Sequence, residues 1–131
     1  MKLLELLRSW TTTNPFIGTD IISVQRIARL LESHGDRFRQ KTFSPKEISY
    51  CDSKASPPLH YAGRFAAKEA IKKCILSTGK VDQIGFNEIE ILPGKNGEPI
   101  VSLIEKLSYI KLEVSISHEK EYAIAMALII I

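Results

Sequence analysis

The spacing of apolar residues changes midway along this chain, and that change restricts the folds open to it. Early in the chain, Val24, Ile27 and Leu31 recur at helical spacing and mark one face of a helix. Near the end, Leu112 and Val114 alternate with polar residues, as on one face of a strand. Helices in the first half followed by hairpins in the second predict an α+β fold. At 131 residues, the chain suits a single domain.

Capping residues and glycines indicate where the helices begin and end. Ser23 is placed to cap the first main helix, and Gly35 is its expected stop. Residues 44–47 (SPKE) form a capping box with proline at the first helical position, which predicts a short helix to about Cys51. The longest helix is expected over about 60–76, and strands over 16–22, 86–92, 98–103, 111–117 and 122–131.

The last predicted strand is apolar on both faces. Ala123, Ala125 and Ala127 alternate with larger apolar residues at positions 124, 126 and 128. A strand of this kind must be covered on both sides. The helices of the first half can cover one side, and a neighbouring subunit is the expected cover for the other. The alternative cover is the N-terminal segment Leu3–Trp10, whose apolar residues have helical spacing.

Composition and charge narrow the class of partner. The net charge is +3, from 18 Lys and Arg against 15 Asp and Glu, which suits an anionic small ligand or an acidic protein surface. Arg26 and Arg29 are neighbours on one helix face, either solvated or a dock for an acidic protein. Aromatic residues are not interleaved with these cations, which argues against single-stranded nucleic acid. With no membrane-length apolar run and no secretory signal, a cytoplasmic protein is expected.

Two carboxylates stand out because their surroundings are otherwise apolar or cationic. Asp20 shares a strand face with Gly18 and Ile22, where an ionised group is costly unless it is paired or bound to a metal. Glu69 lies among cations in the long helix. Two such acids near Lys and Arg suit a divalent metal that carries a phosphate. The alternatives are a cap or an ion pair for Asp20, and an exposed i,i+4 pair with Lys73 for Glu69.

Basic residues gather along the long helix and near the last strands. Arg64, Lys68 and Lys72 recur every four residues, forming a stripe that a bound anion would stabilise and that is otherwise a solvated face. His118 follows a predicted strand face. A lone histidine there is more often a surface residue than a catalyst, so its value is its position at the edge of the sheet.

Taken together, these segments resemble the holo-[acyl-carrier-protein] synthases, the small bacterial type of 4′-phosphopantetheinyl transferase. The run Gly63–Ala70 (GRFAAKEA) has the family's signature without change. Four further motifs lie in the family's order along the chain. They are GTDI at 18–21 with Arg26 after it, FSPKE at 43–47, FNEIEI at 86–91 with NGEP at 96–99, and VSISH at 114–118 followed by Tyr122 and Ala123.

The resemblance implies an antiparallel sheet packed with a long helix over residues 16–131, after an N-terminal extension of residues 1–15. It implies transfer of 4′-phosphopantetheine from coenzyme A to a serine of apo acyl carrier protein, in fatty acid biosynthesis, by a homotrimer with sites at subunit interfaces. The implied catalytic residues are Asp20 and Glu69, which would hold Mg²⁺, with Lys73 and His118. Lys73, His118 and Arg64 are expected at the phosphates of coenzyme A, and Arg26 and Arg29 at the carrier protein.

Two departures from the family pattern and two alternative functions stay open. The extension has no counterpart in the family, and the turn at 77–80 (STGK) has fewer glycines than the family's turn. One alternative function is a non-enzymatic module that binds an anion or a protein. The other is a phosphopantetheinyl transferase of broader specificity, although such enzymes usually resemble two tandem copies of this fold and 131 residues hold one.

Overall fold

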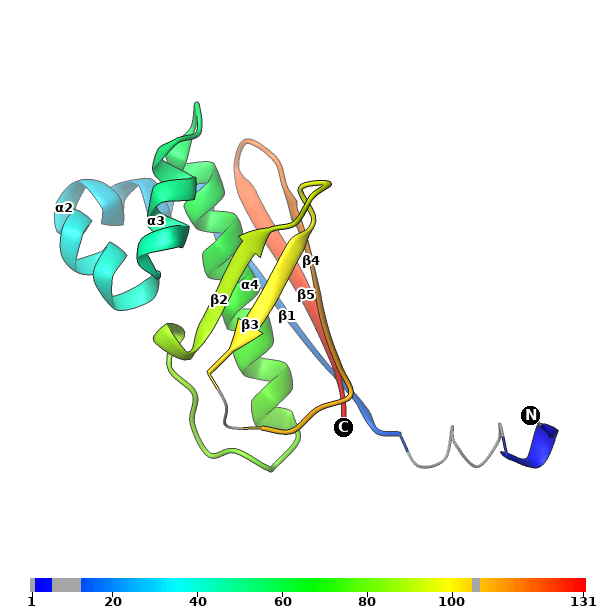
Figure 1. The fold of residues 1–131 in the computed structure, drawn as a ribbon. Helices are drawn as coiled ribbons and strands as arrows, with labels where there is room; N and C mark the ends of the chain where they lie inside the picture. Colours follow the sequence, from blue (N-terminus) through cyan, green and yellow to red (C-terminus); the bar gives the residue numbers. More distant parts are fainter. Residues whose placement is uncertain (1, 6–12, 105–106) are drawn as a thin grey trace.

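A computed structural model of the chain describes residues 2–5, 13–104 and 107–131. Residues 3–5 are helical, and the rest of the helix predicted over Leu3–Trp10 lies outside the described residues. No described helix is long and apolar enough to cross a membrane. The elements in chain order are β1 (Pro15–Ser23), α2 (Val24–Thr42), α3 (Pro45–Asp52), α4 (Pro57–Ser77), the 3₁₀ turn η1 (Phe86–Glu88), β2 (Ile89–Pro93), β3 (Pro99–Leu103), β4 (Lys111–His118) and β5 (Tyr122–Ile130) (Figure 1).

The strands form two antiparallel sheets, and α4 lies between them (Figure 1). One sheet has the order β1-β5-β4, and the other pairs β2 with β3. In the larger sheet, Ala125 of β5 pairs with Asp20 on one side and Ile116 on the other. The predicted α+β fold with a long helix is confirmed, with its strands divided between the two sides of that helix.

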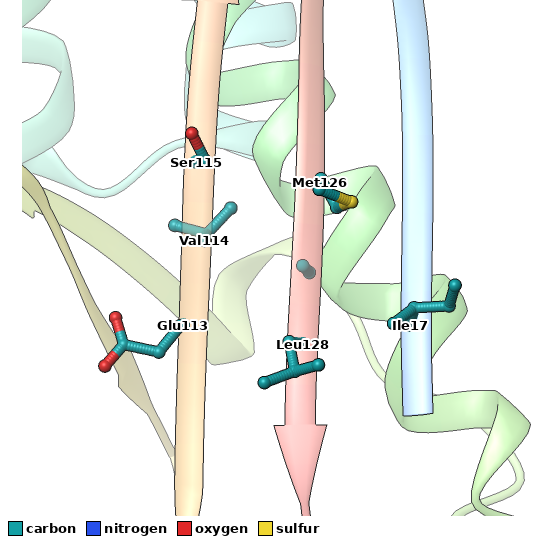
Figure 2. Close-up of a pocket in the computed structure, with 7 residues that line it drawn as sticks. Ile17, Glu113, Val114, Ser115, Met126 and Leu128 are labelled. Atoms are coloured by element: carbon teal, nitrogen blue, oxygen red, sulfur yellow. The ribbon is translucent and has the colours of Figure 1, made fainter. Parts of the chain in front are cut away.

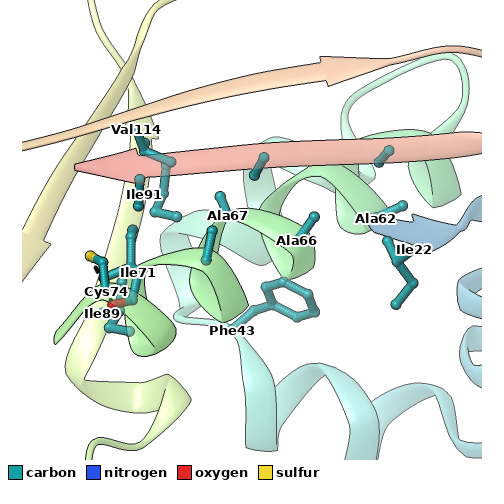
Figure 3. Close-up of a cluster of buried hydrophobic side chains, with 14 of the residues drawn as sticks. Ile22, Phe43, Ala62, Ala66, Ala67, Ile71, Cys74, Ile89, Ile91 and Val114 are labelled. Carbon is teal, nitrogen blue, oxygen red and sulfur yellow. Dashed lines mark hydrogen bonds between the residues drawn. The ribbon is translucent and has the colours of Figure 1, made fainter. Parts of the chain in front are cut away.

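Small residues let α4 lie close to the larger sheet. The buried residues of α4 that face it include Ala62, Ala66 and Ala67 (Figure 3). Gly18 of β1 makes the closest approach, since a Cβ atom there would lie 2.1 Å from the carbonyl oxygen of Ala70. Any side chain at this position would push β1 away from α4. Gly18 therefore sets the distance at which the next residues of β1 meet the helix.

A buried ion pair ties the other side of α4 to the rest of the fold. Lys68 Nζ lies 2.6 Å from Glu47 Oε1, and both side chains are fully buried. The same amine donates to the backbone carbonyls of Thr42 and Phe86. Glu47 also accepts hydrogen bonds from backbone N–H groups at the start of α3 and in β2. Every charged group in this network is satisfied, as burial of charge requires.

The predicted basic stripe along α4 is wrong, because its three residues meet three different environments. Arg64 is buried on an aromatic ring of α3, Lys68 pairs with Glu47, and the Lys72 amine lies 4.1 Å from the centre of the Phe86 ring. Four residues advance an α-helix by about 400°, so each member of such a series is rotated about 40° from the one before it. The rotation therefore gives each residue a different neighbour, and both Arg64 and Lys68 are buried.

Three predicted boundaries also need correction. Helix α2 continues past Gly35 to Thr42, with non-helical backbone angles at His34 (φ −136°, ψ 29°). Gly35 does not take the positive φ of a glycine that ends a helix, so the chain bends and the helix resumes. Helix α4 begins at Pro57, because proline is accepted in a first helical turn. The strand predicted from residue 86 begins at Ile89, after η1.

On the face of the larger sheet that points away from α4, strands β1 and β5 carry exposed apolar residues. Ile17 and Ile21 of β1 and Ile124 and Met126 of β5 are 47–63% exposed. Figure 2 shows residues that line a pocket on this face, with Met126 on the central strand β5 and Ile17 and Ser115 on the strands to either side. No described residue covers this face, and the alternative cover by Leu3–Trp10 falls mostly outside the described residues. The prediction that β5 is apolar on both faces is therefore confirmed.

Candidate active site

Strand β1 and helix α4 bring Asp20 and Lys73 together. Asp20 lies on the face of β1 that packs against α4, and 16% of its side chain is exposed. The Lys73 amine is 3.1 Å from Asp20 Oδ1, and it also donates to the carbonyl of Thr19 at 2.9 Å. The close approach at Gly18 makes this contact possible, because it holds the start of β1 against the helix. An ion pair for Asp20, one of the alternatives from sequence, is thus present.

Glu69 lies one helical turn before Lys73 and is half-buried. The i,i+4 ion pair that the sequence offered as an alternative is absent, because Lys73 reaches across to β1 instead. Within the described residues Glu69 has no hydrogen bond and no ion pair. These residues also hold no group of three or more His, Cys, Asp or Glu side chains that could bind a metal.

Arg64 is the most unusual charge in the described structure. Its residue is 7% exposed, and its guanidinium lies 4.4 Å from the centre of the Tyr50 ring. Nε and Nη2 are buried and have no hydrogen-bond partner within the described residues. A buried cation without a partner is costly, and a cation–π contact offsets only part of that cost. The site therefore favours an anion beside Arg64.

His118 at the end of β4 lies near Arg64 through a series of aromatic contacts. The rings of His118 and His60 are 5.7 Å apart, and the rings of His60 and Tyr50 are 6.0 Å apart. Burial lowers the pKa of His60, and the positive charges of His118, Lys54 and Arg64 lower it further. The Lys54 amine also lies 4.7 Å from the centre of the Tyr50 ring.

These groups divide into two half-sites on opposite sides of α4. The first half-site consists of Asp20, Glu69 and Lys73, and the second of Tyr50, Lys54, His60, Arg64 and His118. At about 100° per residue, the two sets of α4 residues are separated by roughly 140–180° around the helix. The strand order agrees, because Asp20 lies on β1 and His118 on β4, at opposite edges of the sheet. One chain therefore does not bring all the predicted residues together.

The remaining predicted residues, Arg26 and Arg29, are exposed on α2. Ser23 caps the helix by accepting a hydrogen bond from the Arg26 backbone N–H, as the sequence predicted.

Sequence reasoning missed Tyr50 and His60 as parts of the site. Both residues fall in predicted helical regions, and only the packing of α3 and β4 against α4 brings their rings together.

Comparison with known proteins gives the same family as the sequence motifs. The family model of the 4′-phosphopantetheinyl transferase superfamily matches residues 16–127. The chain is 44% identical over 115 residues to a holo-[acyl-carrier-protein] synthase of Protochlamydia amoebophila, with 85% of this chain and 93% of the relative covered. It is 45% identical over 121 residues to the synthase of Ruminiclostridium cellulolyticum, with 86% and 90% covered.

Solved structures agree at the level of the fold. The chain is similar to the ACPS–CoA complex of Chronobacterium ammoniagenes, with a TM-score of 0.75, 31% identity, and 88% of this chain and 96% of that chain covered. It is also similar to the Helicobacter pylori holo-[acyl-carrier-protein] synthase in complex with coenzyme A, with a TM-score of 0.72, 30% identity, and 86% and 98% covered.

Proposed function

The chain belongs to the 4′-phosphopantetheinyl transferase superfamily, within the holo-[acyl-carrier-protein] synthase family, and we propose a site and an assembly for its reaction. The enzyme transfers 4′-phosphopantetheine from coenzyme A to a serine of apo acyl carrier protein. The serine oxygen bonds to the phosphorus that carries the arm, and the bond from that phosphorus to the bridging pyrophosphate oxygen breaks. Adenosine 3′,5′-bisphosphate leaves, and the serine proton goes to a carboxylate or to water.

The buried, unpaired guanidinium of Arg64 is the observation that carries the proposed site. Its free Nε and Nη2 groups need an acceptor, and phosphate oxygens suit an arginine particularly well. Coenzyme A carries a pyrophosphate and a further phosphate. A phosphate beside Arg64 would neutralise the buried charge and so remove much of its cost.

The first half-site fits a divalent metal. Asp20 and Glu69 offer the hard carboxylate oxygens that Mg²⁺ prefers, and the Lys73 amine at Asp20 shows that this carboxylate attracts a cation. With two protein ligands, Mg²⁺ keeps several positions for water and phosphate oxygens, as it usually does in phosphoryl-transfer sites. When bound, Mg²⁺ would neutralise negative charge on the pyrophosphate.

Lys73 and His118 have roles that follow from their positions. The Lys73 side chain is 53% exposed, so its amine can turn from Asp20 to a phosphate oxygen of the substrate. His118 is exposed at the end of β4 and can donate a ring N–H to a phosphate. Neither residue makes a covalent intermediate, because phosphoryl transfer depends mainly on positioning and charge neutralisation.

Arg26 and Arg29 are the proposed dock for the carrier protein. Both are exposed on α2, where charged groups steer an acidic partner into place. Arg26→Ala should raise KM for the carrier protein and leave KM for coenzyme A unchanged. A raised KM for coenzyme A alone would contradict this role, and it would place Arg26 with the phosphate-binding residues.

We further propose that the enzyme is a homotrimer with its sites between subunits. Two observations support the assembly. The outer face of the larger sheet exposes Ile17, Ile21, Ile124 and Met126, an apolar area that a neighbouring subunit can cover. The two half-sites lie on opposite sides of α4, so a neighbour that presents its second half-site to the first would complete the site.

Mixing two inactive variants tests the shared site directly. Glu69→Gln damages the first half-site, and Arg64→Met combined with His118→Ala damages the second. When the two proteins are unfolded and refolded together, mixed trimers contain sites with two intact halves, so activity should reappear. If the mixture stays as inactive as its components while light scattering shows trimers, the site lies within one chain. A monomer mass at micromolar concentration would remove the trimer itself.

Mass spectrometry of the carrier protein tests the reaction. Apo acyl carrier protein, coenzyme A, Mg²⁺ and this enzyme should give a carrier heavier by one phosphopantetheine. The control is a carrier whose acceptor serine is alanine. An unmodified carrier under all metal conditions would instead favour a non-enzymatic binding module.

Addition of a chelator tests the metal requirement. A role in fatty acid biosynthesis and a cytoplasmic location stay predictions.

A further inference from the structure

His118 is held in place by an aromatic ring and by no hydrogen bond among the described residues. It is exposed at the end of β4, and its one ring contact is the tilted, edge-on stack with His60 at 5.7 Å and 67°. An exposed side chain that must meet a phosphate in one orientation gains from such a support. Gly63 favours the close packing of β4 on α4, because a Cβ there would make a tight contact of 3.2 Å with Ile116 Cγ2.

His60 is itself fixed by its neighbours. Its ring meets the edge of the Tyr50 ring at 6.0 Å and 88°. The Tyr50 ring in turn has the Lys54 amine 4.7 Å and the Arg64 guanidinium 4.4 Å from its centre. This series of contacts links Arg64 to His118 on β4 through the rings of Tyr50 on α3 and His60 on α4.

We infer that His60 is a positioning residue, which holds the ring of His118 in the orientation that meets a phosphate of coenzyme A. The inference rests on the proposed function, because it needs His118 at the phosphate. It assigns His60 no contact with the substrate. His60 acts on His118 through the shape and orientation of its ring. An aromatic ring without a titratable group should therefore restore most of the effect.

The charges that face His60 support a neutral ring in this role. They come from Lys54, which precedes α4, from Arg64 on α4 itself, and from His118 on β4, while Tyr50 of α3 contributes an uncharged ring. Burial and these cations all lower the pKa of His60. A neutral His60 adds no further positive charge beside these cations.

Four variants of His60 and His118 test the inference. His60→Ala should lower kcat/KM for coenzyme A roughly two- to tenfold, because an edge-to-face ring pair makes a contribution of that size. His60→Phe should recover most of the loss. In the double variant His60→Ala/His118→Ala, the loss should equal that of His118→Ala alone, since a support has no effect once its ring is gone. His34→Ala, which removes an exposed histidine of α2, is the matched control.

A second readout does not depend on turnover. Binding of adenosine 3′,5′-bisphosphate, followed by calorimetry, should weaken in His60→Ala and recover in His60→Phe, with thermal midpoints close to that of the unchanged protein. Fully additive losses in the double variant, or full activity in His60→Ala, would overturn the positioning role. Full activity in His118→Ala would remove the proposed phosphate contact of His118 and the inference with it, whereas an unmodified carrier protein would overturn the reaction as a whole.

Discussion

Helix α4 carries two lysine–carboxylate pairs that have opposite surroundings. Lys68 and Glu47 are fully buried at 2.6 Å, and the amine has two further acceptors. Lys73 and Asp20 lie 3.1 Å apart, with 53% of the lysine side chain and 16% of the aspartate side chain exposed. The same two chemical groups thus form a closed network at Lys68 and Glu47, where no solvent reaches them, and an open one at Lys73 and Asp20, where solvent does.

The difference separates a structural role from the proposed functional one. A closed buried network fixes the positions of the elements that it joins. Its donors and acceptors are all paired, so none is left to bind a ligand. The proposed site keeps groups whose bonding is incomplete. Lys73 lies beside solvent, and among the described residues Glu69 has no partner and Arg64 has two unpaired donors. Incomplete bonding costs stability in the free protein and is recovered when a substrate binds.

The largest expected effect comes from opening the closed network. Lys68→Met should lower the free energy of unfolding by about 3–5 kcal/mol, because it leaves the Glu47 carboxylate buried without its cation. Lys73→Met is the matched control and should change the same quantity by less than about 1 kcal/mol, since its pair is partly solvated. Urea unfolding of both variants measures the contrast. Equal losses would mean that the two pairs do not differ in role.

Glu69→Gln should have the next largest effect, on activity and not on stability. The change removes one charge from a carboxylate that has no hydrogen bond or ion pair among the described residues, so the unfolding midpoint should stay nearly constant. Transfer to the carrier protein should fall by about 100-fold or more, as expected when a charge that serves phosphoryl transfer is lost. A large loss of stability with activity retained would instead indicate an ion pair.

Arg64→Met should weaken coenzyme A binding without destabilising the free protein. The methionine keeps an unbranched side chain against Tyr50 and removes two buried donors that have no partner among the described residues. We expect KM for coenzyme A to rise about tenfold, which corresponds to about 1.4 kcal/mol. The free energy of unfolding should stay constant or increase. A clear decrease would show that Arg64 serves the fold and not the substrate.

The smallest expected effect is a pH dependence of the free energy of unfolding, which comes from His60 in the second half-site. Because the pKa of His60 is lowered in the folded state, the folded protein binds fewer protons than the unfolded chain below about pH 6.5. This contribution to stability is present above that pH and is lost as the pH falls through the folded value. Unfolding at pH 7.5 and 5.5 should show a loss of under about 1 kcal/mol, because solvent screens a half-exposed ring. His60→Phe should lack this part of the loss.

Local patterns predicted most of the elements. The capping box at residues 44–47 and the cap at Ser23 involve residues three positions apart, and both are present. The wrong boundaries occur where a distant contact outweighs a local signal. Gly35 does not end α2, because the helix resumes and packs Phe38 against Phe43 and Phe65. The segment from Phe86 begins as a turn, whose carbonyl at residue 86 accepts a hydrogen bond from Lys68.

For the proposed site, the sequence motifs named the candidate residues but not how they are grouped. Asp20, Glu69, Arg64, Lys73 and His118 were all named from motifs, and of the first half-site the structure joins Asp20 to Lys73. Helical spacing places Arg64 and Glu69 about 140° apart on α4. Only the packing of α3 and β4 on one side and of β1 on the other assigns them to different half-sites. The pairing of Tyr50 with His60 was also missed, because aromatic contacts between elements leave no periodic signal.

The sequence by itself determined the family, the order of the elements and the apolar character of both faces of β5. These properties depend on residues that are close together along the chain or on motifs read in order. The tertiary structure alone decided which lysine is buried and which is available to a substrate. Lys68 meets a residue 21 positions away and Lys73 one 53 positions away, and burial depends on such contacts. Identical side chains four or five residues apart can therefore have different roles, because desolvation depends on what packs against them and not on their own chemistry.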